Sequence, residues 1–194
     1  MTDAFMGIDQ AFGGFSIVIW VPDWHKAEFD LKTYPSKTYG QGVDRLKSVS
    51  DNIVGFAYGI YARNLEIKHI CMEGYARNSK FRREEAGELG ATVKLTLSAA
   101  YSKPVSYPTI VPPKLLKMFV TGSGNSSKDD MRAGVHKRWG ETIFNHNHAD
   151  AYGLARMAEA LHTGTADSRY PHEQIAIAKL TPHGEEFPPL EITA

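Results

Sequence analysis

Residues 5–21 of the chain read FMGIDQAFGGFSIVIWV. Two apolar runs, 5–8 and 15–21, are rich in β-branched and aromatic residues, and the turn-forming segment 11–14 separates them. This arrangement is typical of a β-hairpin. Asp9 follows the first run directly. The stretch therefore predicts the first two strands of a sheet, with a carboxylate at the end of the first strand.

Apolar periodicity continues along the rest of the chain. Further strands are expected over about 28–34, 66–72 and 107–111. Helices are expected over about 42–63, 79–100, 113–120, 127–139 and 148–161. Because strands alternate with amphipathic helices, we predict an α/β fold whose mixed five-stranded sheet carries helices on both faces.

Length and composition fit one globular domain. The chain has 194 residues, of which 42% are hydrophobic and 23% are charged, as is ordinary for a protein with a buried core. We expect one domain over 1–162 and a loosely packed C-terminal extension over 163–194.

Cys71 is the single cysteine, so an intrachain disulfide is excluded and a buried, unreactive thiol is expected. No signal peptide or membrane-spanning run is evident, which favours a cytoplasmic protein without a membrane partner.

The charge sums to zero, with 22 basic and 22 acidic residues, but it is unevenly distributed. Residues 77–83 and 114–138 are rich in lysine and arginine, whereas residues 139–194 hold eight acids against three basic residues. Such basic clusters are typical of phosphate-binding surfaces, and they are equally typical of solvated helix faces. Charge alone leaves both interpretations open.

Three acids stand where a metal site can be built. Asp9 ends the first predicted strand, Glu73 follows the buried run 70–72, and Asp150 lies at the start of the last predicted helix. Hard cations such as Mg²⁺ prefer oxygen ligands and keep positions open for water and phosphate. The alternative is that the strand-end acids are solvated and that the helix-start Asp is a cap.

Four segments, in this order, resemble the motifs of the RuvC Holliday-junction resolvases, especially their shorter phage-type relatives. The segments are Met6–Gln10, Ile70–Tyr75, Pro113–Lys128 and Ala149–Ala155. The third resembles the family's lysine–GxG–lysine stretch that contacts DNA, and it is the most specific of the four. The resemblance covers about residues 5–160 and implies an RNase H-like fold for the nuclease domain over 1–162.

The resemblance also implies an activity. It indicates a structure-specific, metal-dependent endonuclease that resolves Holliday junctions and other branched DNA, in the cytoplasm of a bacterium or of a phage-infected host cell. Asp9, Glu73 and Asp150 would bind two Mg²⁺ ions, with Mn²⁺ as an alternative. Such a pair of ions holds the attacking and leaving oxygens of a phosphodiester in line.

The fourth ligand is where the chain departs from the family. Relatives often place an acid or a histidine three residues before the last Asp, whereas this chain has Asn147. An amide oxygen can bind Mg²⁺, but it brings no charge. His146 and His148 are the other candidates, as ligands or as a general base, and both also fit polar residues at the start of a helix.

The same resemblance implies DNA-binding residues. Lys117 and Lys128 match the family's two lysines, and Lys114 lies one turn earlier. A second group of candidate contacts follows Glu73, namely Lys80, Phe81, Arg82 and Arg83. Phe81 and Tyr75 stand where relatives carry an aromatic residue that probes the junction centre. Packing at the head of a helix is the other interpretation, and we prefer it for Tyr75.

Partners and rival functions follow from the same pattern. RuvC relatives are twofold homodimers, and the predicted helices over 42–63 and 79–100 are candidate dimer elements. A broader branched-DNA or flap endonuclease would use the same residues without paired, symmetric incisions. A non-catalytic structure-specific DNA-binding protein is left open by Asn147, although the three acids argue against it. An actin-like or sugar-kinase fold also begins with Gly-Ile-Asp, but the second phosphate-binding motif that it needs is not found in the sequence.

Overall fold

The structure is a computed structural model that describes residues 1–74, 83–102, 105, 107–165 and 169–180. The strands are β1 (Thr2–Asp9), β2 (Phe15–Val21), β3 (Lys26–Lys32), β4 (Leu65–Glu73) and β5 (Thr109–Val111). The helices are a 3₁₀ turn η1 (Pro22–Trp24), α1 (Ser36–Tyr39), α2 (Val43–Ala62), α3 (Arg83–Ala100), α4 (Pro113–Thr121), α5 (Lys128–Trp139), α6 (His146–Thr163) and α7 (Pro171–Ala178). Every predicted strand and helix over 1–162 therefore has a counterpart.

The strands form one mixed sheet in the order β3-β2-β1-β4-β5. β1 is antiparallel to β2 and parallel to β4, and β5 runs parallel to β4 on the outer side. β1 is thus a central strand with a neighbour on each side. The parallel pairing of β1 with β4 brings the carboxyl ends of the two strands to the same edge of the sheet.

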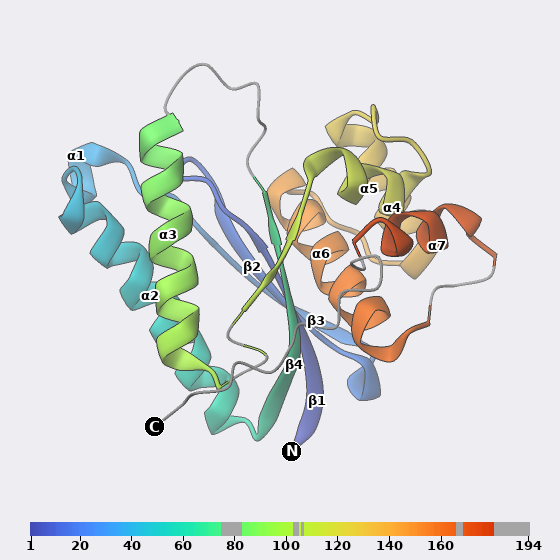
Figure 1. Cartoon of the computed structure of the whole chain (residues 1–194), viewed down its shortest axis with the longest axis horizontal. Coiled ribbons are helices and arrows are strands. Elements are labelled where there is room, and N and C mark those ends of the chain that lie inside the picture. Colours follow the sequence, from blue (N-terminus) through green and yellow to red (C-terminus); the bar gives the residue numbers. More distant parts are fainter. Residues whose placement is uncertain (75–82, 103–104, 106, 166–168, 181–194) are drawn as a thin grey trace, which may run out of the picture.

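Helices cover both faces of the sheet, as predicted. Figure 1 shows α2 and α3 on one face and α4 to α7 on the other. Along β1, Met6 and Ile8 belong to the core shared with α2 and α3, whereas Phe5 belongs to the core shared with α6. This alternation follows from the two-residue period of a strand. Asp9, two residues after Gly7, therefore lies on the α6 face.

A glycine lets α6 lie directly on β1. A Cβ placed on Gly7 would lie 1.9 Å from the carbonyl oxygen of Ala151 and 2.4 Å from the backbone nitrogen of Ala155. Any side chain at this position would therefore overlap the helix backbone. The close approach places the first two turns of α6 beside the end of β1.

Several boundaries differ from expectation, among them the start of β5, which lies at Thr109 rather than at 107. The third strand covers 26–32 rather than 28–34. α6 begins at His146, two residues earlier than predicted, because the Asn145 side chain accepts a hydrogen bond from the backbone N–H of Asn147 at 2.8 Å and caps the helix. Asn147 and His148 are therefore helical residues.

The expectation of a loosely packed extension over 163–194 is wrong for its middle part. Helix α7 packs against α4, and Ala176 is fully buried in the core shared with α6. Glu173 forms a buried ion pair with Arg138 of α5. This packing could not be predicted from the sequence, because the two charged partners lie 35 residues apart. Among the residues that the structure describes, no helix is long and apolar enough to cross a membrane.

Candidate active site

Two acids meet at the carboxyl edge of the sheet. Asp9 and Glu73 are the last residues of β1 and β4, and the register pairs Ile8 with Met72 directly before them. Burial raises the pKa of both carboxyl groups, and a hydrogen bond between them raises the pKa of Asp9 further while it partly offsets the rise at Glu73. Asp9 is only 6% exposed, so the pair is largely shielded from water.

The third acid comes from α6. Asp150 lies on the first turns of the helix, next to Ala151, whose backbone contacts Gly7 of β1. Its charge raises the pKa of Asp9, and the charge of Glu73 raises the pKa of Asp150 in turn. The tertiary fold thus brings together all three acids that the sequence singled out.

Burial and repulsion make this cluster costly to ionise. Burial is the main cause that raises the pKa of Asp150 to about 7, followed by the charge of Glu73. Burial likewise raises the pKa of Asp9 well above its usual range, with further contributions from Glu73 and Asp150. A cation removes both penalties, because it favours the charged form of each carboxylate. The oxygen-only donor set suits a hard divalent ion.

The three acids are not yet a complete ligand set. Among the described residues, no group of three acid, histidine or cysteine side chains is already placed to hold one ion. The Asp9–Glu73 pair is joined by its hydrogen bond, whereas Asp150 acts on the pair through its charge. Binding of one ion by all three would therefore require the three carboxyl groups to move closer together.

Two lysines lie beside the acids. Burial raises the pKa of Glu73 and of Asp150, and the charges of Lys117 of α4 and Lys128 at the start of α5 offset part of that rise; Lys128 does the same for Asp9. Both cations therefore belong to the same cluster, although more than 40 residues separate them from Glu73. Lys114 lies one turn before Lys117 on α4.

The loop between α4 and α5 holds Lys128 in place. Gly122 ends α4 in the left-handed region, with φ of 87°. A Cβ on Gly124 would lie 3.1 Å from the carbonyl oxygen of Lys114, so the loop folds back on the start of α4. Ser127 and Asp130 then form a capping box that starts α5 at Lys128. The two glycines of the GxG pattern thus allow the chain to turn tightly between Lys117 and Lys128.

Three polar residues at the start of α6 face different neighbours. Asn147 packs on the β1–β2 hairpin, since a Cβ on Gly14 would lie 2.0 Å from its Nδ2. Burial and the charges of Lys128 and Arg132 lower the pKa of His146, which places it toward α5. The ring of His148 packs 5.2 Å from that of Phe29 in β3.

Some candidates fall outside the described residues. These are Tyr75, Lys80, Phe81 and Arg82, and the structure describes Arg83 only as the first residue of α3. The sequence did not identify Gln10 as a site residue, yet its side chain donates a hydrogen bond to the carbonyl oxygen of Glu73 at 2.8 Å. It links the ends of β1 and β4. No sequence signal identifies a partner 63 residues away.

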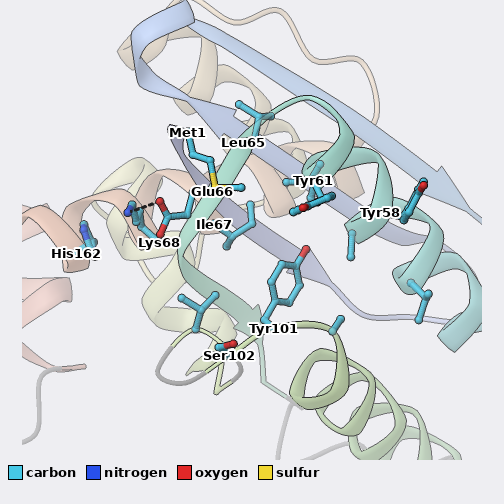
Figure 2. A pocket seen from close by; sticks show the side chains of 15 residues that line it. Met1, Tyr58, Tyr61, Leu65, Glu66, Ile67, Lys68, Tyr101, Ser102 and His162 are labelled. Carbon is cyan, nitrogen blue, oxygen red and sulfur yellow. Dashed lines mark ion pairs between the residues drawn. The ribbon is translucent and has the colours of Figure 1, made fainter.

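A separate cavity of about 650 Å³ lies at the opposite end of β4. Leu65 and Ile67 line it, together with Tyr61 of α2 and Tyr101, which directly follows α3 (Figure 2). Its lining is mainly apolar, and the charged Lys68 within it is already paired with Glu66 at 2.8 Å. This cavity lacks the carboxylate cluster.

Comparison with known proteins identifies the fold. No protein-family model and no curated protein sequence matches the chain. Among solved structures, RuvC of Thermus thermophilus matches with a TM-score of 0.60 and 16% identity. T. thermophilus RuvC in complex with a Holliday junction substrate matches with a TM-score of 0.61 and 18% identity. Both matches cover 86% of this chain and 98% of the other. The predicted RNase H-like fold, as in RuvC, is confirmed.

Proposed function

We propose that this protein is a metal-dependent endonuclease that cleaves Holliday junctions and related branched DNA. The observation that carries the proposal is the buried cluster of Asp9, Glu73 and Asp150 beside Lys117 and Lys128. Fold likeness alone does not define an activity. Here, however, the acids and the cations converge at one edge of a RuvC-like sheet, and a matched RuvC structure holds a Holliday junction substrate.

The acids are the proposed metal-binding groups. Asp9, Glu73 and Asp150 would hold Mg²⁺ or Mn²⁺, since both cations prefer oxygen ligands. When bound, a pair of such ions supplies an activated water and stabilises the leaving oxygen of a phosphodiester. Asn147 remains the proposed neutral fourth ligand, with its amide packed against the hairpin that follows Asp9.

The chain's own cations and bases have distinct roles. Lys117 and Lys128 bind the phosphates that flank the cut, which contributes affinity and register without reading sequence. Because the pKa of His146 is lowered, its imidazole is neutral near pH 7 and able to accept a proton. Of the two histidines at the start of α6, His146 is the better general-base candidate, because His148 packs against Phe29.

We propose that a second copy of the chain docks on the outer face of α2 and α3. Val54, Tyr58 and Tyr61 lie three or four residues apart on α2, so they form one stripe, and all three are exposed. All three line the apolar cavity, and Figure 2 labels Tyr58 and Tyr61 there. An exposed apolar surface of this kind favours protein–protein contact. A twofold dimer would present two sites to the two symmetric strands of a junction.

The activity is tested on labelled four-way junction, flap and linear duplex DNA, with Mg²⁺ or EDTA. We expect paired, symmetric nicks in the junction that require metal. Asp9→Asn should abolish cutting and retain binding, whereas Asp3→Asn, a matched change near the other end of β1, should cut normally. Equal cutting of flaps would favour the broader endonuclease. A junction that is bound but never cut with Mg²⁺ or Mn²⁺ would leave a non-catalytic DNA-binding protein.

A further inference from the structure

One aromatic side chain beside the candidate site has no packing role. Phe144 is 85% exposed, more than any other large hydrophobic side chain that the structure describes. It lies in the short connection between α5 and α6, two residues before His146. Leaving a phenyl ring in water forgoes the stabilisation that burial provides. Single exposed apolar residues are common, however, so exposure alone does not define a binding site.

The backbone around Phe144 is fixed on both sides. Ile143 is buried in the core, and Asn145 caps α6. The Arg132 side chain of α5 donates a hydrogen bond to the carbonyl oxygen of Phe144 at 2.8 Å. Arg132 is itself oriented by Asp129, with an N–O distance of 2.6 Å. The exposed ring is therefore displayed from an anchored position.

The anchored ring belongs to the basic side of the acid cluster. Arg132, which holds the Phe144 carbonyl, lies one turn after Lys128 on α5, and Phe144 precedes the first residue of α6 by two residues. Lys128 in turn acts on Asp9 and Asp150. The Phe144 backbone is therefore held by the same helix, α5, that carries Lys128. Figure 1 shows the start of α6 beside the end of β4.

Positive charge next to an exposed aromatic ring fits one ligand chemistry. Lysine and arginine bind the phosphate backbone, and an aromatic face stacks on a base that is not already stacked in a duplex. Unpaired bases occur at the branch point of a junction and in single strands. We propose that Phe144 is a stacking site for an unpaired DNA base close to the cut, an inference that rests on the proposed nuclease function.

Binding in EDTA, which prevents cutting, tests this assignment. The probe is a four-way junction with 2-aminopurine at the branch point, and a fully paired duplex of the same length is the DNA control. Phe144→Ala should weaken junction binding about 5- to 150-fold, which corresponds to about 1–3 kcal/mol for stacking one base. Binding of the wild-type protein should change the fluorescence of the 2-aminopurine, because the base becomes stacked on the ring. Phe144→Ala should abolish this change and leave duplex binding unaltered. Phe144→Trp should restore both signals.

A matched control variant is Trp24→Ala, which removes a partly exposed aromatic side chain at the other end of the sheet. It should bind the junction like the wild-type protein. Equal losses on junction and duplex, or unchanged binding and fluorescence with Phe144→Ala, would overturn the stacking assignment. If the wild-type protein then still cuts the junction with Mg²⁺, the nuclease function stands without it. A wild-type protein that neither binds nor cuts the junction would overturn both.

Discussion

Substituting Gly7 tests how the site is assembled. In Gly7→Ala the new Cβ would lie 1.9 Å from the carbonyl oxygen of Ala151, whereas ordinary contact begins near 3.4 Å. The obstructing atoms belong to helix backbone, so no change of rotamer relieves them. Helix α6 would have to retreat by about 1.5 Å along this contact. Overpacking of this kind costs about 1–3 kcal/mol, which corresponds to a fall in Tm of roughly 2–12 °C for a chain of this size.

The retreat should affect catalysis more than stability. Asp150 precedes Ala151 and would move with it, away from Asp9 and Glu73. A misplacement of about 1 Å in an active site costs on the order of 100-fold in rate. The assays are thermal unfolding and junction cleavage in Mg²⁺, measured on the same preparation.

A matched glycine provides the control. Gly55 is exposed on α2, and a Cβ there meets no atom within 4 Å. Gly55→Ala should keep its cleavage rate and gain up to about 1 kcal/mol of stability, since alanine favours helix. If Gly7→Ala melted within about 1 °C of the wild-type protein and cut equally fast, the reasoning about close packing of β1 and α6 would be refuted.

Three further outcomes are expected. Because burial raises the folded-state pKa of Asp150 from 3.8 to about 7, the metal-free protein should lose stability as pH rises from about 4 to 7. Asp150→Asn should flatten that dependence in melts with EDTA. Lys128→Ala should weaken junction and duplex binding alike and reduce the slope of log K against log salt by about 0.9, measured in salt titrations. Glu173→Gln should remove the negative charge that pairs with the buried Arg138, and it should lower the free energy of unfolding in urea by about 3–5 kcal/mol. Unchanged unfolding would mean that α7 contributes little.

The acids of the site were predictable because each stands at a recognisable boundary. Asp9 and Glu73 end apolar runs, and Asp150 opens a helical pattern. Lys117 and Lys128 were indicated by the resemblance to the RuvC lysine–GxG–lysine stretch, and local caps explain the turn between them. Each of these features can be recognised from a few neighbouring residues.

The start of α6 was harder to predict. The sequence His146-Asn147-His148 does not say toward which neighbour each side chain points, because that depends on which residue is the first of the helix. The Asn145 cap starts the helix at His146 and turns the three side chains to different neighbours. A shift of one residue on a helix rotates a side chain by about 100°. Sequence alone could not rank the candidate fourth ligands for this reason.

By itself, the sequence determined the order of strands and helices, the mixed sheet and the residues that could build a site, because periodicity, turns and caps are local. Only the tertiary structure decided that Gly7 brings α6 onto β1, that Gln10 links two strand ends, and that Glu173 pairs with Arg138. The same holds for Phe144, whose exposure depends on the packing around it. These features depend on residues far apart in the chain, and burial and charge act between them only once the core has formed.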